Sequence, residues 1–124
     1  MPVIRTLDLL PMTLAAVSTT EVAIPAGEWT LAAGVTAVKA WGEVRGVNGN
    51  AQVRAGVQLA NDRRSPETTV GIGNVKASNG MIDPALAQVT SGDREWIRPV
   101  WLVSLSSAGS LATLSVIGTL VLEG

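Results

Sequence analysis

Two acidic residues, Asp93 and Glu95, stand two positions apart, a spacing that places side chains on one face of a strand. Two carboxyl groups that face each other across a cleft can act as a general acid and a general base. Acids beside a turn, such as the SGD segment at 91–93, are more often solvated charges. The chain has no histidine and no cysteine, and it carries no nucleophile-elbow or phosphate-loop motif. We therefore expect no enzymatic activity and no cofactor.

Oxygen donors for a metal ion occur in the polar segments of the chain, at Asn61, Asp62, Glu67 and Asp83. No segment has the ligand spacing of a known calcium loop. The missing histidine and cysteine remove the usual ligands of transition metals. We therefore interpret these four residues as solvated turn residues and expect no metal site.

The aromatic residues are four tryptophans, without phenylalanine or tyrosine. We expect Trp41 and Trp96 to point away from the core, in the neighbourhood of Arg45, Arg54 and Arg98. Tryptophan and arginine are enriched where proteins contact each other. Stacking on a sugar ring is an alternative role for an outward tryptophan. A third alternative is local shielding of a neighbouring strand.

Composition limits the architecture. The 124 residues suit one domain, residues 1–124, and 47% of them are hydrophobic. The formal net charge of −1 gives no strong field for nucleic acid or an anionic membrane. No apolar run is long enough for a transmembrane helix. Asp8 and Pro11 interrupt the apolar start, so we expect no cleaved signal peptide.

Short alternating segments bounded by glycine and proline predict about eight strands in an antiparallel β-sandwich, most simply a jelly roll. The turn at 24–29 is expected to close a hairpin that pairs Ile24 with Trp29. The predicted strands are residues 3–10, 13–24, 35–46, 51–60, 69–76, 85–90, 94–105 and 111–122.

The Asn-Gly dipeptide at 48–49 predicts a tight hairpin between residues 35–46 and 51–60. A two-residue turn there pairs Val44 with Val53 and gives one uniformly apolar face. The same register sets Trp41 opposite Gly56, on the polar face. Covering that glycine is the shielding role that Trp41 could have.

A second predicted hairpin turns at the Ala-Gly dipeptide at 108–109 and gives an apolar face that contains Trp101. Its other face carries Val100, Leu102 and Ile117 and is half apolar. A solvated face needs fewer apolar residues. Either another part of the domain or a partner must cover this face.

Pro99 cannot donate a hydrogen bond to a neighbouring strand, which predicts an edge position or a bulge at this point. A bulge would exchange the two faces of the strand on one side of it. Without a bulge, Trp101 faces the core and Trp96 points outward.

The segments IPAGEWTL at 24–31 and WIRPVWLVSLSSAGSLATLSVIGTLVLEG at 96–124 resemble small structural proteins of tailed bacteriophages. Those jelly-roll or related sandwich proteins decorate, cement or cap the virion. The resemblance implies a capsid cement or decoration protein that bridges shell subunits as a homo-oligomer, a trimer for example. Its partner would be a major capsid or other virion protein. The implied location is the virion, after synthesis in the host bacterial cytoplasm.

The alternative function is a carbohydrate-binding or receptor-binding module, which would expose its tryptophans in the assembled state. Our interface hypothesis comprises the outward aromatic and basic residues together with the half-apolar face: Trp41, Arg45, Arg54, Trp96, Arg98, Val100, Leu102 and Ile117.

Overall fold

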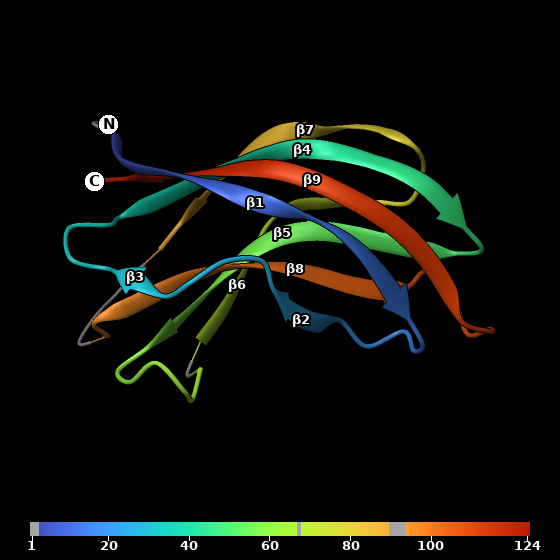
Figure 1. The fold of residues 1–124 in the computed structure, drawn as a ribbon, viewed down its shortest axis with the longest axis horizontal. Coiled ribbons are helices and arrows are strands. Elements are labelled where there is room, and N and C mark those ends of the chain that lie inside the picture. Colours follow the sequence, from blue (N-terminus) through green and yellow to red (C-terminus); the bar gives the residue numbers. More distant parts are fainter. Residues whose placement is uncertain (1–2, 67, 90–93) are drawn as a thin grey trace.

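The computed structural model describes residues 3–66, 68–89 and 94–124, and these ranges form nine strands in two antiparallel sheets packed face to face (Figure 1). One sheet has the order β1 (Val3–Ala16), β9 (Ala112–Glu123), β4 (Ala37–Asn48) and β7 (Gly80–Gln88). The other has the order β2 (Val22–Pro25), β8 (Trp96–Leu105), β5 (Ala51–Ala60) and β6 (Thr68–Lys76), and β3 (Thr30–Leu31) also pairs with β8.

The topology is that of a jelly roll. Strands β2 and β3 follow each other along the same neighbour, β8, and together form one interrupted strand. Counted this way, each sheet has four strands. The chain crosses from one sheet to the other between β4 and β5 and again between β8 and β9, while β5 and β6 are neighbours in one sheet. The predicted antiparallel sandwich is confirmed.

Both predicted hairpins are wrong, because their strands lie in opposite sheets. Val44 pairs with Val116 of β9, and Val53 pairs with Val103 of β8. The turn at 48–49 is real, and Gly49 adopts a φ of 78°. It carries the chain from one sheet to the other instead of reversing it within one. Strands β8 and β9 are connected in the same way.

The turn at 24–29 does not reverse the chain into a hairpin either. Ile24 lies opposite Trp101, and Thr30 lies opposite Ile97 farther along the same strand. The predicted pairing of Ile24 with Trp29 is therefore wrong. The turn is an excursion between two short strands that share β8 as their neighbour.

Pro99 lies where this interruption occurs. β2 ends opposite Val100 and β3 begins opposite Ile97, so the neighbouring position beside Pro99 has no strand. The Pro99 carbonyl accepts a hydrogen bond from the Ala26 amide at 3.0 Å. The pairing of β8 with β5 runs through Pro99 without a register shift. There is no bulge at Pro99. The proline nitrogen, which has no hydrogen to donate, faces the gap between β2 and β3, where no strand needs a donor.

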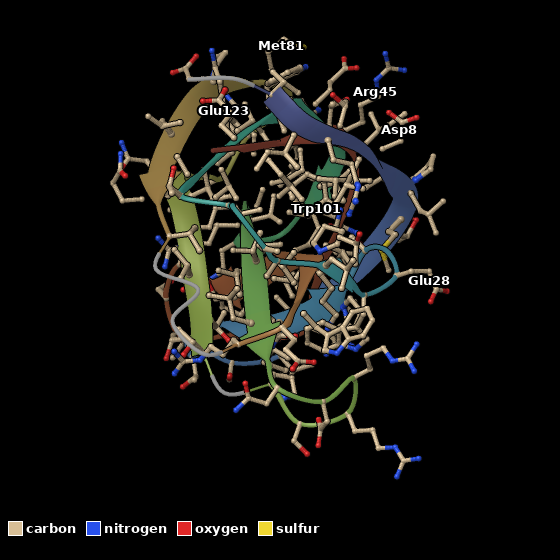
Figure 2. The ribbon with its side chains drawn as sticks, turned by 90° about the vertical axis from the view of Figure 1, so that its left-hand side faces the viewer. Asp8, Glu28, Arg45, Met81, Trp101 and Glu123 are labelled. Atoms are coloured by element: carbon tan, nitrogen blue, oxygen red, sulfur yellow. The ribbon has the colours of Figure 1, made fainter. Side chains whose placement is uncertain are left out.

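The core lies between the sheets and is built from aliphatic residues around Trp101, which is fully buried as predicted (Figure 2). Two glycines, Gly42 and Gly118, pair with each other in the opposite sheet. A Cβ atom built on Gly118 would lie 3.0 Å from the Trp101 ring. The indole ring therefore occupies space that Gly118 leaves open.

Two strand boundaries differ from the prediction. β1 is one strand of 14 residues, where two strands were expected, and its register against β9 shifts between Leu9 and Met12. Pro11 lies at this shift. β7 begins at Gly80, five residues before the predicted strand at 85–90. Thr90 and the SGD segment at 91–93 lie outside the described residues.

Candidate functional site

A cluster of tryptophan and arginine side chains lies on the outer side of the β2-β8-β5-β6 sheet, where β3 and β5 flank the start of β8. Ala60 of β5 pairs with Trp96, and Leu31 of β3 pairs with Trp96 from the other side. Arg98 follows two residues later on the same face of β8, opposite Gln58. Trp29 precedes β3 and reaches this face from the excursion at 26–29.

The Trp29 ring is held against Arg98. The Arg98 guanidinium carbon lies 4.4 Å from the ring centroid, within the range of a cation–π contact. Its Nε donates a hydrogen bond to the Gln58 side-chain oxygen at 2.9 Å. Burial lowers the pKa of Arg98, since desolvation disfavours the charged guanidinium. The ring and the guanidinium therefore form a fixed pair.

The Trp96 ring has a second arginine beside it. The Arg63 guanidinium carbon lies 4.7 Å from the ring centroid. Arg63 comes from the polar segment between β5 and β6 and is exposed, whereas Trp96 is half-buried. The strand thus fixes the ring, while the arginine reaches it from an exposed loop.

Asp62 shapes the loop that carries this arginine. Its carboxylate accepts hydrogen bonds from the backbone amides of Arg64 and Ser65, at 2.9 and 2.8 Å. These bonds from Ser65 and Arg64 lower the pKa of Asp62, because they stabilise its ionised form. The Asp62 carboxylate therefore stabilises the conformation of its own loop.

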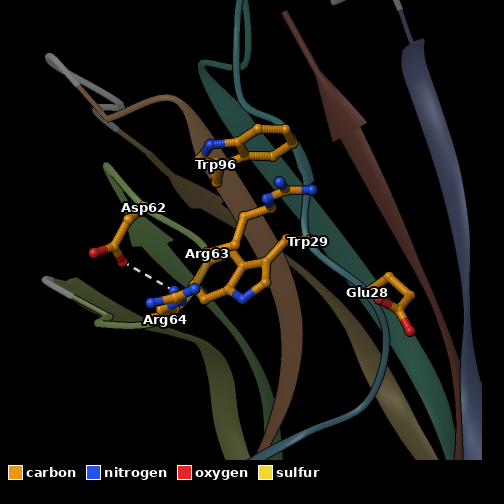
Figure 3. A pocket seen from close by; sticks show the side chains of 6 residues that line it. All are labelled: Glu28, Trp29, Asp62, Arg63, Arg64 and Trp96. Carbon is orange, nitrogen blue, oxygen red and sulfur yellow. Dashed lines mark hydrogen bonds between the residues drawn. The ribbon is translucent and has the colours of Figure 1, made fainter.

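Five of these side chains, with Glu28, line a hollow of about 610 Å³ that we call the Trp–Arg hollow: Glu28, Trp29, Asp62, Arg63, Arg64 and Trp96. Figure 3 shows the Arg63 guanidinium beside Trp96, with Trp29 on the other side of Arg63 in this view, while Glu28 points away from the group. Two half-buried indoles and two exposed guanidinium groups thus share one concave site.

Farther along the same sheet, Arg54 is paired within the chain. Its guanidinium donates two hydrogen bonds to the Glu21 carboxylate, at 2.8 and 2.7 Å. The hydrogen bond that Arg54 donates to Glu21 raises the Arg54 pKa, against the opposing effect of burial. A Cβ atom on Gly71 would lie 2.4 Å from the guanidinium carbon of Arg54, so the side chain covers that glycine.

The half-apolar face of β8 is covered within the chain. Val100 is fully buried and Leu102 is 4% exposed. Leu102 lies against Gly56, where a Cβ atom would be 3.0 Å from Leu102 Cδ1. Shielding of Gly56 by Trp41 is therefore wrong, because Trp41 lies in the other sheet, opposite Thr119. Val100 and Leu102 are therefore buried without a partner protein to cover them.

The outer side of the β1-β9-β4-β7 sheet carries a second candidate surface, which we call the Ile117 face: Leu10, Pro11, Glu43, Met81 and Ile117. Glu43 pairs with Ile117 on one side and with Met81 on the other, so these side chains form a row across three strands. They line a shallow hollow of about 420 Å³. Figure 2 shows Met81, Arg45 and Asp8 on this side, away from Trp101.

Trp41 and Arg45 flank this row on β4. Trp41 is half-buried and has the orientation away from the core that was predicted. Arg45 makes an ion pair with Glu43 at 3.1 Å, and its side chain is 76% exposed. Arg45 thus lies at the border of the Ile117 face, while its ion-pair partner Glu43 lies between the apolar side chains of the row.

The structure separates the eight residues of the interface hypothesis into different surfaces. Trp41, Arg45 and Ile117 lie on one sheet, and the other five lie on the opposite sheet. Of those five, Trp96 and Arg98 join the tryptophan–arginine cluster. Sequence reasoning did not include Trp29 or Arg63 among the candidate site residues. The available signal was a tryptophan two residues after the glycine of the Pro-Ala-Gly turn at 25–27.

The remaining candidate sites receive no support in the described ranges. No group of three or more possible metal ligands gathers in them. Glu67 and Asp93 lie outside the described ranges. In the part of the chain that the structure describes, no helix is long and apolar enough to cross a membrane.

The strand order defines a jelly-roll domain of the kind that occurs in virus particles. The chain is similar to that of T=1 particles derived from infectious bursal virus, with a TM-score of 0.64 and 12% identity over 94% of this chain and 30% of that chain. The infectious bursal disease virus Gx strain structure gives a TM-score of 0.60 at 13% identity, over 94% of this chain and 32% of that one.

A VP2 subviral particle of infectious bursal disease virus gives a TM-score of 0.56 at 14% identity, over 94% of this chain and 31% of that one. The chain thus spans about a third of the length of these neighbours. No family model and no curated protein sequence matches. At these identities the similarity establishes a fold shared with chains of virus particles. Kinship with tailed bacteriophages stays a prediction.

Proposed function

We propose that the chain is a non-enzymatic structural protein of a virion, of the cement or decoration type, and that the Ile117 face contacts a neighbouring protein of the shell. The fold shared with chains of virus particles supports the virion role. The apolar row on the Ile117 face carries the proposal of contact. The neighbour is a second copy of this chain or a major capsid protein.

The exposure of this row is the central observation. Leu10 is 62% exposed, Met81 is 59% exposed and Ile117 is 48% exposed, and all three line the same hollow. Contiguous apolar surface of this kind is typical of protein contact sites. Glu43 lies within the row, between Ile117 and Met81, and Arg45 at the border of the row suits the polar rim of an interface. Trp41 beside the row adds a side chain that is frequent in binding hot spots.

The virion role is tested by fractionation. Cells that produce the virus are lysed, particles are separated on a density gradient, and the chain is followed by mass spectrometry. We expect it in the particle fraction. A chain that stays with free proteins at the top of the gradient contradicts the proposal.

The contact is tested with Ile117→Lys, which replaces an exposed apolar side chain of the row with a charged one. We expect the variant to lose particle binding, or self-association measured by sedimentation velocity. Leu111→Lys is the matched control, since Leu111 is 64% exposed but lies in the β8–β9 connection. Equal behaviour of the two variants would remove the Ile117 face from the proposal.

A further inference from the structure

We propose that the Trp–Arg hollow binds a carboxylated sugar ring. The apolar face of the sugar would pack on the indoles, and its carboxylate would lie between Arg63 and Arg64. This binding site is separate from the Ile117 face, and it does not depend on the proposed virion role.

The indoles are presented by rigid elements. Trp96 belongs to β8 and has paired strands on both sides. Trp29 is held by Arg98, which is itself hydrogen-bonded to Gln58. Both rings are half-buried, so each keeps part of its surface at the hollow. Fixed aromatic surface in a concave site binds an apolar ring face at little cost in conformational entropy.

The two exposed guanidinium groups at the hollow favour an acid over a neutral sugar, because they can donate hydrogen bonds to a carboxylate. The Arg63 and Arg64 side chains are exposed. Two carboxylates also line the hollow: Asp62, which stays ionised and accepts two backbone amides of its own loop, and Glu28, which points away from the group (Figure 3). Guanidinium groups bind carboxylates through short, charge-assisted hydrogen bonds. Arg63, which now lies over Trp96, can turn toward a bound carboxylate because it belongs to a loop.

The size of the site and the charge of the chain favour a compact ligand over a nucleic acid strand. The hollow of about 610 Å³ lies in the ordinary range of small-molecule pockets. A nucleic acid strand requires a basic groove that follows successive phosphates, and the chain has a net charge of −1. A single acidic sugar fits a hollow of this size, and its carboxylate can accept hydrogen bonds from the two adjacent arginines.

The test is a titration of the intact chain followed by tryptophan fluorescence. The probe is D-glucuronate, compared with D-glucose for the neutral ring, acetate for the carboxylate alone, and a short oligothymidylate for nucleic acid. We expect saturable millimolar binding of glucuronate and at least about tenfold weaker binding of glucose and acetate. Tighter binding of the oligothymidylate, equal binding of glucose or acetate, or no saturation with glucuronate would overturn the proposal.

Variants locate the binding site. Arg64→Gln should weaken glucuronate binding about tenfold, because it removes a charge-assisted hydrogen bond from an exposed position. Arg45→Gln is the matched control, since Arg45 is an exposed arginine on the opposite sheet. The melting temperatures of both variants are measured to check that each variant folds. Retained affinity in Arg64→Gln, or equal loss in Arg45→Gln, would place binding elsewhere and refute the assignment.

Discussion

At the scale of single residues, the packing of Trp101 depends on Gly118 of the opposite sheet, which has no side chain in the space that the ring occupies. Its ring is fully buried, and its indole Nε1 has no hydrogen-bond partner among the described residues. An unpaired buried donor costs about 1–3 kcal/mol. The packing of the ring against Gly118 and the aliphatic core must offset that cost. Gly118 is therefore as important to the fold as the tryptophan that it accommodates.

Gly118→Ala should lower the free energy of unfolding by about 1–3 kcal/mol, the usual cost of overpacking a core. The new Cβ atom would lie 2.7 Å from the Trp41 carbonyl oxygen and 3.0 Å from the Trp101 ring, and the backbone oxygen cannot turn aside. Urea denaturation followed by fluorescence measures the change.

Gly109→Ala is the control for this substitution. The nearest atom to a Cβ on Gly109 lies 3.8 Å away, in the Asn50 side chain, and Gly109 has no positive φ. We expect its stability to stay within about 1 kcal/mol of the parent chain. Equal destabilisation by both substitutions would show that the contact with Trp101 is not the cause.

At the scale of elements, the positions of the strands could be predicted from the sequence, but their partners could not. Val44 and Val53 both face the core, which is what the alternating pattern requires. That pattern is satisfied equally when the two strands pair within a sheet and when they face each other across the core. The Asn-Gly turn suits both connections. Only the long-range pairing with β9 and β8 distinguishes them.

The candidate site illustrates the same limit. The outward direction of Trp96 could be predicted from the alternation along its strand. The contact of Trp29 with Arg98 could not, because it requires β3 to lie beside β8. The contact of Arg63 with Trp96 likewise depends on the path of a loop after β5. Local patterns fix directions, and tertiary pairing decides which side chains meet.

The end of β4 and the turn that follows it give a prediction at this scale, because Gly46 lies at a register shift in β4 and Gly49 lies in the turn. Gly46 and Gly49 both have positive φ, 63° and 78°. Alanine at either position should cost about 1–2 kcal/mol of backbone strain. Gly49→Ala should cost more, because its Cβ atom would lie 2.9 Å from the Cβ of Ala112, whereas Gly46 has open space.

Asparagine separates strain from crowding in this comparison, because it tolerates positive φ better than alanine does. Gly46→Asn should recover most of the stability lost in Gly46→Ala, and Gly49→Asn should not recover it. Thermal melting of the four variants provides the measurement. Full recovery at both positions would mean that Ala112 does not crowd Gly49.

At the scale of the whole molecule, the sheets join segments that are far apart in the chain. β1 pairs with β9, and β5 pairs with β8. Non-local pairing slows folding, because the connecting chain must be ordered before its contacts form. We expect refolding from urea in milliseconds to seconds in a stopped-flow experiment. Refolding in microseconds would contradict the topology.

The pairing of β1 with β9 also determines how the molecule responds to mechanical force. Val3 lies opposite Glu123, and the strands run antiparallel from there, with both ends of the chain on the same side of the molecule (Figure 1). Tension between these two residues would load the hydrogen bonds one pair at a time and unzip the edge of the sheet. Tension between Val3 and Ala112 would shear many bonds together and meet far greater resistance. The chain therefore withstands tension best when the load is applied at opposite ends of the β1–β9 pair.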